Sequence, residues 1–418
     1  MREMRDSGIP WIGDIPKDWE TCQVKNIFAI SRGRVIPITD MDDSYPYPVY
    51  SSQTKDNGCM GYIPTFDYEG EALTWTTDGA NAGTVFYRFG KFNCTNVCGV
   101  LQLKIRDSLI NYMLYSVGHS AFHCRRADTN GYKIMSNEMA EIKIAVPPLA
   151  EQQRIAEFLD RKCAEVDEMI GLQEQIIEEL KAYKQSVITE AVTKGLNPAA
   201  PMRDSGIEWI GQIPEHWEVC RIKNAASLFG RIGFRGYTSD DLNKDGEGAI
   251  TLSPSNMLPM GMDYSSVTYL SWAKYYESPE IQIQNGDILM VKTGSSYGKV
   301  SYVDNLPREA TINPQILRIV SKINSKYLGY YLQTPLFIYQ VEGGVVGGTI
   351  PTISQEKINN FFIVASPTQE QKAIANYLDE KCADIDSLIQ TKQSKIDSLK
   401  EYKKSIIYEY VTGKREVE

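Results

Sequence analysis

Two stretches of the chain repeat apolar residues at alternating steps of four and three. The first runs from residue 159 to 191 and the second from 378 to 410. A heptad pattern sustained over more than four heptads predicts a long helix that packs along a narrow seam against another helix. The apolar seam positions are Leu159, Cys163, Val166, Ile170, Ile177 and Leu180 in the first helix, and Leu378, Cys382, Ile385, Ile389, Ile396 and Leu399 in the second.

Polar residues interrupt the two seams at matching heights, Gln173 and Lys184 in the first helix and Lys392 and Lys403 in the second. Such residues fix the register of a coiled coil at some cost in stability. Each helix would be about 65 Å long at ~1.5 Å per residue. A lone helix with a narrow apolar seam needs a partner, and the other copy supplies one. We therefore expect the two helices to pack against each other.

The ends of both helices carry recognisable signals, since a proline precedes each of them. In the second helix, Thr368 and Gln371 have the spacing of a capping box, with Thr368 as N-cap and Gln371 reaching back. Gly195 and Gly413 lie just beyond the last turns, where a left-handed residue closes a helix.

The intervening stretches favour strands. Apolar or alternating runs between glycines occupy 84–87, 97–103, 287–292 and 299–303, and short helices are predicted at 110–117 and 326–333. Two glycine-bracketed loops, 76–85 and 292–300, resemble each other. These features predict two copies of one mixed fold.

The chain repeats itself with two different offsets. Residues 4–13 recur at 202–211, which is 198 positions later, whereas 148–193 recur at 367–412, which is 219 positions later. The repeated segments form a common frame, and the segments that lie between them have diverged. This arrangement is expected of a protein that holds two different recognition modules in equivalent places.

The repeat predicts the organisation of the chain. The fold class is α+β: two strand-rich domains of one fold, separated by two long helices that form a coiled coil. The predicted parts are a first domain at 1–147 with repeated segment 4–26, a helix at 148–195, a second domain at 196–366 with linker 196–201 and repeated segment 202–224, and a helix and tail at 367–418.

Composition narrows the class of protein. The 418 residues are 42% hydrophobic and carry a formal charge of -9. We find no run of about 18 apolar residues and no signal-peptide pattern, so we expect neither membrane insertion nor secretion. The eight cysteines fit a reducing cytoplasm better than a disulfide scaffold. The net charge is only weak evidence for or against a nucleic-acid-binding site, because it mainly affects solubility and the long-range steering of charged partners.

Catalytic motifs are poorly represented. The segment 294–299 has one residue too few between its glycines for a phosphate-binding loop, and Val300 replaces the needed hydroxyl. The segment 146–149 lacks the polar first and aromatic last residues of an adenine methyltransferase motif. Glu141 and Lys143 have a nuclease-like spacing without a convincing partner carboxylate. We interpret these segments as turns, helix starts and solvated strand charges.

A zinc site is a further hypothesis. Cys94, Cys98, His119, His123 and Cys124 supply suitable ligand types, and the spacings within each pair are near those of structural sites. The gap between the pairs is long for a zinc finger, and the second copy has nothing equivalent. Cys98 also lies in an apolar run, where cysteine usually acts as a small buried hydrophobe. We therefore expect no metal.

Nucleic-acid contact is better supported. Gln, Asn and Arg read base edges in the major groove through paired hydrogen bonds, and polar loops of both variable segments carry such side chains. The candidate DNA-binding residues are Ser51, Ser52, Gln53, Asp78, Asn81 and Arg88 in the first domain, and Ser255, Asn256, Ser295, Ser296, Tyr297 and Lys299 in the second. Polar loops on any surface look the same, so for each residue a purely structural role stays open.

The whole pattern resembles the specificity (S) subunit of bacterial type I restriction-modification enzymes. The matching pieces are WIGDIPKDW at 11–19 with its repeat, PPLAEQQRIA at 147–156 with its repeat, and the two seam helices. No single motif is decisive. The alternating order of the two repeated segments, each present twice, is specific and covers nearly the whole chain.

The resemblance implies that each variable domain is a target-recognition domain for one half of a split, asymmetric DNA sequence. The long helices would pair antiparallel, in a pseudo-two-fold arrangement, and set the unread gap. Two modification subunits would dock on the frame for adenine N6 methylation, and up to two restriction subunits would join. S-adenosylmethionine, ATP and Mg would be bound by those partners, so this chain would hold no cofactor and would not be catalytic alone.

Two alternatives stay open. The recognition subunit of a type IIB-like system, which cleaves on both sides of its site, would have the same sequence features, because the difference lies in the partner subunits. A coiled-coil scaffold that reads no DNA would not need two diverged strand-rich domains inside a repeated frame.

Overall fold

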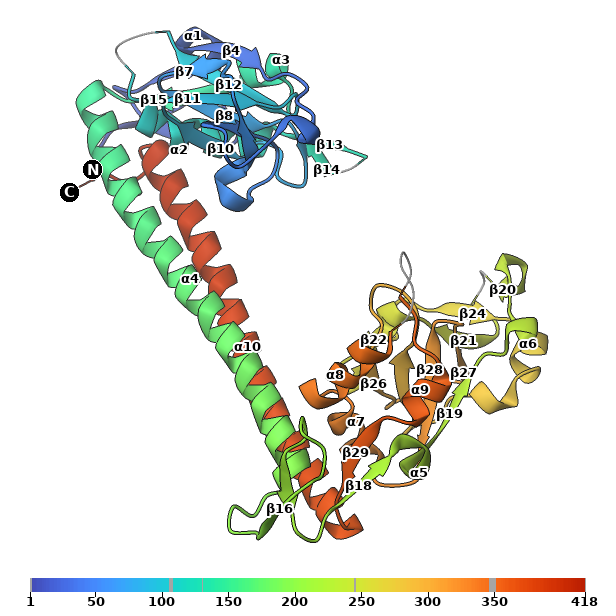
Figure 1. The fold of residues 1–418 in the computed structure, drawn as a ribbon. Helices are drawn as coiled ribbons and strands as arrows, with labels where there is room; N and C mark the ends of the chain where they lie inside the picture. The colour runs from blue at the N-terminus through green and yellow to red at the C-terminus, as the bar shows by residue number, and fades with distance from the viewer. Residues whose placement is uncertain (1, 105–107, 130, 244–245, 346–350, 418) are drawn as a thin grey trace. The chain divides into compact units, whose positions relative to one another are not determined.

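The computed structural model describes residues 2–104, 108–129, 131–243, 246–345 and 351–417. The chain forms two compact units, Met1–Gln175 with Lys392–Glu418, and Ile176–Thr391. Each unit contains one strand-rich domain and part of each long helix (Figure 1). No helix within the described ranges is both long and apolar enough to cross a membrane.

The first domain is built on two four-stranded sheets. One has the order β10-β8-β12-β4 and the other β6-β5-β11-β7, in which β5 and β11 run parallel. Helix α2 (Ile110–Cys124) packs against β10 and β8. The strands of these sheets are β4 (Phe28–Arg32), β5 (Tyr47–Tyr50), β6 (Cys59–Ile63), β7 (Tyr68–Glu69), β8 (Ala72–Thr76), β10 (Val85–Arg88), β11 (Lys91–Cys94) and β12 (Cys98–Leu103).

Shorter elements complete the first unit. They are β1 (Met4–Asp6), β2 (Asp14–Pro16), β3 (Glu20–Gln23), α1 (Val24–Ile27), β9 (Asp78–Gly79), α2 (Ile110–Cys124), β13 (Arg126–Asp128), β14 (Gly131–Lys133), α3 (Ser136–Glu141) and β15 (Lys143–Val146), with 3-10 turns η1 (Ile38–Asp40) and η2 (Lys55–Gly58). Strand β1 pairs with β2 and β3 pairs with β15. The predicted helix at 110–117 is therefore present but longer than expected.

The second domain repeats the order of the first sheet and the parallel strand pair of the second sheet, but its strand β20 pairs with β24, whereas β7 of the first domain pairs with β11 of the parallel pair. Its sheets have the orders β19-β28-β25-β26 and β20-β24-β21-β27, and β21 runs parallel to β27. These strands are β19 (Ala226–Gly230), β20 (Leu242–Asn243), β21 (Ala249–Leu252), β24 (Thr268–Leu270), β25 (Ile288–Val291), β26 (Val300–Tyr302), β27 (Ala310–Ile312) and β28 (Ile316–Ser321). The strands predicted from 287 and 299 thus correspond to β25 and β26.

The remaining elements of the second unit are also short. They are β16 (Met202–Asp204), β17 (Gln212–Pro214), β18 (Glu218–Arg221), α5 (Ile222–Ala225), β22 (Met257–Leu258), β23 (Gly261–Met262), α6 (Trp272–Tyr276), α7 (Ser325–Tyr331), α8 (Pro335–Gly344), α9 (Gln355–Asn359) and β29 (Phe362–Ala365), with η3 (Gly233–Arg235), η4 (Ser239–Asp241), η5 (Pro254–Asn256) and η6 (Pro279–Ile281). Together, α7 and α8 occupy the sequence position of α2.

The two heptad stretches form helices α4 (Leu149–Lys194) and α10 (Thr368–Val411), which pack together. In the first unit Lys403 of α10 donates to Asp167 of α4, and in the second unit Lys184 of α4 donates to Asp386 of α10. An early residue of one helix thus meets a late residue of the other, so the helices run antiparallel. This confirms the predicted fold class of mixed helix and strand with paired long helices.

Burial along α4 and α10 follows the predicted seams. Leu159, Cys163, Val166, Ile177, Leu378, Cys382, Ile385 and Ile396 are buried, and Ile170, Leu180, Ile389 and Leu399 are half-buried. The interrupting residues Lys184 and Lys403 are half-buried and ion-paired. Positive φ angles of 78° at Gly195 and 66° at Gly413 confirm the predicted helix closure.

The predicted capping box at the start of α10 is wrong. The side chain of Gln371 accepts from the backbone N–H of Asn324 and donates to the carbonyl of Ser366, so it does not reach back to Thr368. Gln152 does the same in the first copy, where it joins the N–H of Leu109 to the carbonyl of Pro147. A glutamine that ties the helix start to its domain is common to both copies and makes a threonine cap unnecessary.

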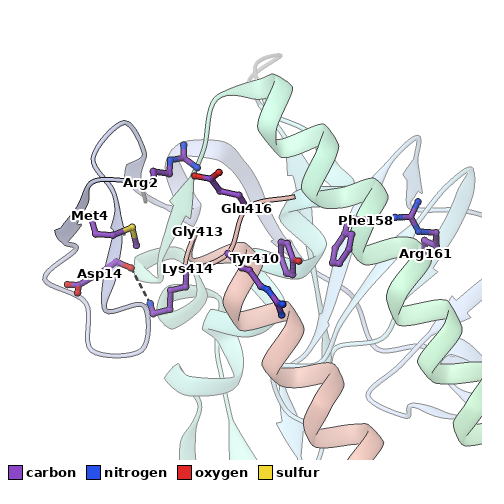
Figure 2. Close-up of a pocket in the computed structure, with 10 residues that line it drawn as sticks. Arg2, Met4, Asp14, Phe158, Arg161, Tyr410, Gly413, Lys414 and Glu416 are labelled. Atoms are coloured by element: carbon purple, nitrogen blue, oxygen red, sulfur yellow. Dashed lines mark hydrogen bonds between the residues drawn. The ribbon is translucent and has the colours of Figure 1, made fainter. Parts of the chain in front are cut away.

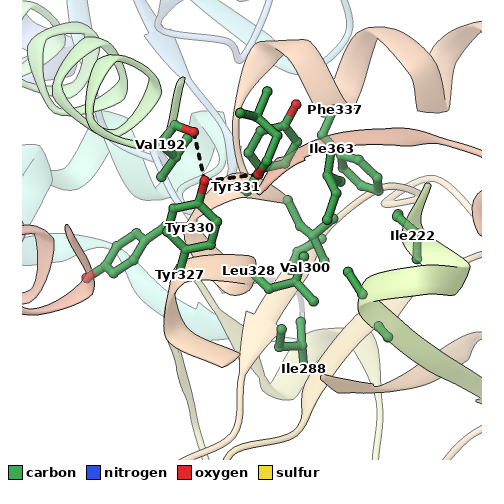
Figure 3. Packing of buried hydrophobic residues seen from close by; sticks show 14 of the residues in the cluster. Val192, Ile222, Ile288, Val300, Tyr327, Leu328, Tyr330, Tyr331, Phe337 and Ile363 are labelled. Atoms are coloured by element: carbon green, nitrogen blue, oxygen red, sulfur yellow. Dashed lines mark hydrogen bonds between the residues drawn. The ribbon is translucent and has the colours of Figure 1, made fainter. Parts of the chain in front are cut away.

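A buried tyrosine joins each domain to a helix end. In the second unit the hydroxyl of Tyr327 donates to the carbonyls of Val192 (3.0 Å) and Val364 (2.9 Å), inside an apolar cluster that includes Leu328 and Phe337 (Figure 3). In the first unit Tyr112 makes the equivalent bonds to Val411 (3.3 Å) and Ala145 (2.9 Å). Each domain is therefore fixed to the last turn of one long helix.

Candidate nucleic-acid interface

Two loops of the first domain bring predicted contact residues together. The loop from Ser51 to Gly58 is closed by a backbone hydrogen bond of 2.9 Å between these two residues. Asn81, on the glycine-bracketed loop after β8, donates to Thr54 of the first loop at 3.4 Å. Gln53 and Asn81 are exposed, and Ser51 and Ser52 are half-exposed. This cluster of polar side chains can donate and accept hydrogen bonds at the surface.

Asp78 belongs to the same region but already has partners. Its carboxylate accepts from the hydroxyl of Thr77 and lies 2.9 Å from the ammonium of Lys133. Burial disfavours its charged form, but these two partners outweigh that effect and lower the pKa of Asp78. A carboxylate held in this way mainly organises the loop that carries Asn81.

Arg88 lies inside the domain, with 2% of its surface exposed. Its side chain starts at the end of edge strand β10, donates from Nε to the hydroxyl of Thr74 at 3.0 Å, and stacks on the ring of Tyr50 with 3.6 Å from Cζ to the ring centroid. Burial lowers the pKa of Arg88. In this structure Arg88 is therefore not available at the surface, in contrast to Gln53 and Asn81.

The second domain also joins two predicted loops. Lys299 donates from Nζ to the carbonyl of Pro254 at 3.1 Å, which connects the loop before β26 with the turn after β21. Gly294 and Gly298 bracket the first of these loops with φ angles of 105° and 81°. The glycines at the equivalent places in the first domain, Gly79 and Gly83, have φ angles of 94° and 87°. The two domains thus share the conformation of this loop but not its side chains.

Within these loops Ser255 and Ser295 are exposed, whereas Ser296, Tyr297 and Lys299 are half-exposed. Asn256 is different, because it is only 4% exposed. Its amide oxygen accepts from the N–H and hydroxyl of Ser253, and its amide nitrogen donates to the carbonyls of Asp263 and Ser266. Asn256 therefore holds its own turn together and has no group left for a base.

The residues of the zinc hypothesis separate into two places. Cys94 and Cys98 lie in a buried cluster between the two sheets with Phe92 and Val100. His119 and His123 lie on α2, where Nε2 of His119 is 3.1 Å from the carbonyl oxygen of Trp11. Among the residues that the structure describes, no three His, Cys, Asp or Glu side chains are grouped so that they could hold a metal ion.

A repeated contact ties each N-terminal segment to a long helix. The indole Nε1 of Trp19 donates to Oε2 of Glu151 at 3.0 Å, and that of Trp217 donates to Glu370 at 2.9 Å. These two Trp–Glu contacts were not predicted from the sequence. Their signal is that both partners recur, Trp19 at the offset of 198 and Glu151 at the offset of 219.

A cavity of about 1020 Å³ lies where the N-terminal hairpin meets α4 and the end of α10 (Figure 2). Its basic residues are mostly engaged with neighbouring groups. Arg2 is bound by Glu151 and Asp18, and Lys414 donates to the carbonyls of Ile12 and Asp14. The residues that line the cavity therefore join the N-terminal hairpin to α4 and to the end of α10, and they leave little unpaired charge for an anion.

Comparisons with known proteins agree with this geometry. Two segments, 16–182 and 214–412, match the family model described as the type I restriction modification DNA specificity domain. The type I restriction enzyme MjaVIII specificity subunit of Methanocaldococcus jannaschii is 26% identical over 96% of this chain and 93% of its own. The putative type I specificity subunit S.MpnORF289P N-terminus of Mycoplasma pneumoniae is 39% identical over 34% of this chain and 76% of its own.

A solved structure has the same fold. A chain from a study of complex assembly and conformational transition of the type I R-M system superposes with a TM-score of 0.68 over 96% of this chain and 99% of that chain, at 15% identity. The two family matches cover both repeats, including the helices and most of both domains. The chain therefore belongs to the family of type I restriction-modification specificity subunits, and it contains the DNA specificity domain of that family twice.

Proposed function

We propose that each domain reads one half of a split, asymmetric DNA target. The observation that carries this proposal is that the two domains share the strand order of one sheet, the parallel strand pair of the other and the conformation of the glycine-bracketed loop, while their loop side chains differ. Exposed Gln53 and Asn81 stand in the first domain where the second presents exposed Ser255 and half-exposed Ser296. Different side chains on one repeated scaffold favour two different half-sites.

The two helices would set the length of the unread gap. Each helix is continuous, and each unit has one lysine–aspartate pair that fixes the register between α4 and α10. Antiparallel pairing of duplicated helices favours a pseudo-two-fold relation between the domains. Two related domains placed by such an axis would face the two DNA strands in opposite senses, as dimeric repressors do over their half-sites.

The exposed side of the helices supports docking of two modification subunits. Met169 and Tyr402 in the first unit, and Leu388 and Tyr183 in the second, are 43–56% exposed. All four occupy the g position of the heptads defined by the seam, and g positions of an antiparallel pair flank the same side of the seam. Exposed apolar groups of this kind favour protein contact.

These apolar residues form two pairs with the same offset. Met169 corresponds to Leu388 and Tyr183 to Tyr402, each 219 positions apart. Two equivalent apolar patches favour two copies of one partner. We therefore propose two modification subunits and up to two restriction subunits around this chain, with S-adenosylmethionine, ATP and Mg bound by those partners and no catalysis by this chain alone.

Long-read methylation profiling of the source genome, with and without this gene, tests the proposal. We expect a split motif with two unequal half-sites that disappears when the gene is deleted. An unchanged set of methylated sites would contradict the proposal and would favour a scaffold that reads no DNA. Cleavage on both sides of the motif by the purified complex would identify the type IIB-like alternative.

A further inference from the structure

Arg88 has hydrogen-bond donors that the folded domain does not use. Its terminal nitrogens, Nη1 and Nη2, are buried and have no hydrogen-bond partner among the described residues. Buried polar groups are nearly always paired, so an unpaired buried guanidinium requires an explanation. Cation–π contacts with Tyr50 (3.6 Å) and Phe86 (4.7 Å) hold the group in place, but they leave these donors free.

Two other arginines of the chain show how such a group is usually satisfied. Arg231, also buried, donates to the carbonyls of Ile312 and Arg235 and to the hydroxyl of Thr311. Arg318 pairs with the carboxylate of Asp287 at 2.7 Å. Arg231 and Arg318 therefore bind neighbouring segments inside the domain. The terminal nitrogens of Arg88 bind no such group.

The second domain does not need a cation at this position. Strand β26 corresponds to β10, and the residue at the place of Arg88 is Val303, which is buried in an apolar cluster. The strand register supports this equivalence. Ala72 on β8 corresponds to Asp287 just before β25, because the N–H of Gly83 donates to Thr76 as the N–H of Gly298 donates to Val291. Arg88 pairs with Ala72, and the N–H of Val303 donates to the carbonyl of Asp287. The fold is complete with a valine there, so folding does not require the charge of Arg88.

A loop covers Arg88. A Cβ atom placed on Gly58 would lie 3.0 Å from Nη2 of Arg88, so the loop from Ser51 to Gly58 lies directly over the guanidinium. Asp56 and Asn57 of this loop have φ angles of 49° and 52°, a left-handed conformation that Asp and Asn adopt more readily than other non-glycine residues. The loop faces solvent, since residues 53–57 are exposed, so it can move without breaking the packing of the core.

We propose that Arg88 is a DNA-contacting residue held under a cover, and that the loop from Ser51 to Gly58 moves aside when the first domain engages its half-site. Nη1 and Nη2 then donate to two adjacent acceptors of the target. The fork of an arginine matches either O6 and N7 of a guanine or two oxygens of one phosphate. This inference rests on the proposed function, since it presumes that the first domain reads DNA.

Arg88→Val tests the inference, because valine is the residue of the second domain at this place. The variant is assembled with its modification subunits, and methylation is measured on duplexes that carry every single substitution in both half-sites. We expect a folded chain, unchanged reading of one half-site and altered reading of the other. If the acceptor is a guanine, discrimination at one base pair falls by roughly 5- to 150-fold.

If the acceptor is a phosphate, affinity falls equally for all sequences and the salt dependence becomes shallower by about one ion. Arg88→Met, which keeps the length of the side chain without its donors, must give the same result. The inference is overturned if both variants fold and keep wild-type affinity and discrimination at every position. Failure of the proposed function would look different, because the wild-type complex itself would then show no split motif.

Discussion

The ammonium nitrogen of Lys403 on α10 lies 2.6 Å from Oδ2 of Asp167 on α4. The same contact occurs between Lys184 and Asp386 at 2.7 Å, with the roles of the helices exchanged. Both lysines occupy seam positions that interrupt the apolar heptads. A lysine at such a position specifies the register of a coiled coil, and a carboxylate from the opposite helix offsets the cost of placing its charge there.

Reversing one of these charges should weaken the helix pair. In Lys403→Asp, two carboxylates face each other, and we expect a loss of about 1 kcal/mol in the free energy of unfolding, within the range of partly exposed pairs. Asp167→Lys should cost a similar amount. The combination of both substitutions should recover most of the stability in urea denaturation, and additive losses would show that the pair does not interact.

Removing a buried hydroxyl should cost more. Tyr327→Phe deletes the donor for the carbonyls of Val192 and Val364. The carbonyl of Val192 loses that partner, and we expect a loss of about 1–3 kcal/mol in urea denaturation. Tyr183→Phe is the control, because the side chain of Tyr183 is exposed, and it should change the unfolding free energy little. Equal effects of the two substitutions would contradict the structural role of Tyr327.

Acidification should destabilise the first unit through α2. Burial lowers the pKa of His119 and of His123 below the ordinary value of about 6.5. The folded state therefore binds fewer protons than the unfolded state in this range, so stability is full above about pH 6.5 and falls as the pH drops through the folded pKa values. Lys414 and Arg125 add to this effect by opposing a further positive charge nearby.

Thermal unfolding between pH 5 and 8 measures this dependence. His119→Gln combined with His123→Gln should flatten the fall in midpoint temperature below pH 6.5. The residue that corresponds to His119 in the second domain is Thr334, which does not titrate. A wild-type midpoint that stays constant over this range, or a slope that the double variant leaves unchanged, would refute the assignment to these histidines.

The apolar patches predict the number of partner subunits. Met169→Asp with Tyr402→Asp places two charges on the patch of the first unit, and we expect native mass spectrometry to show one modification subunit per chain instead of two. Tyr183→Asp with Leu388→Asp should remove the other copy. Ser394→Asp is the control, because Ser394 is exposed at an f position on the side away from the seam.

Periodicity made the long helices predictable. The steps of four and three from Leu159 onward are a local signal, and the buried residues follow them closely. The bonds of Gln371 to Asn324 and Ser366 were not predictable in this way, because one partner comes from a distant part of the chain. Local sequence therefore suggested a capping box where a tertiary contact occurs.

The candidate site was predicted less well than the fold. Arg88 follows Val85 to Tyr87 on an edge strand, and such a strand does not reveal whether its last side chain faces solvent or the space between two sheets. The role of Asn256 had a local signal, the Ser253-x-x-Asn256 spacing, which is typical of a turn closed by its own side chains. Gln53, Asn81 and Ser295 are exposed, and their contact with DNA stays a prediction.

Inserting one heptad into each helix tests whether the length of the helix pair sets the gap between the half-sites. The insertions belong after Gln175 and after Gln393, which stand at the same height of the antiparallel pair, so the seam keeps its register. Seven residues add about 10 Å at ~1.5 Å per residue, or about three base pairs at ~3.4 Å each. Methylation mapping of the assembled variant should show both half-sites unchanged and a longer gap between them. Altered half-sites with the original gap would show that the helices do not set the gap.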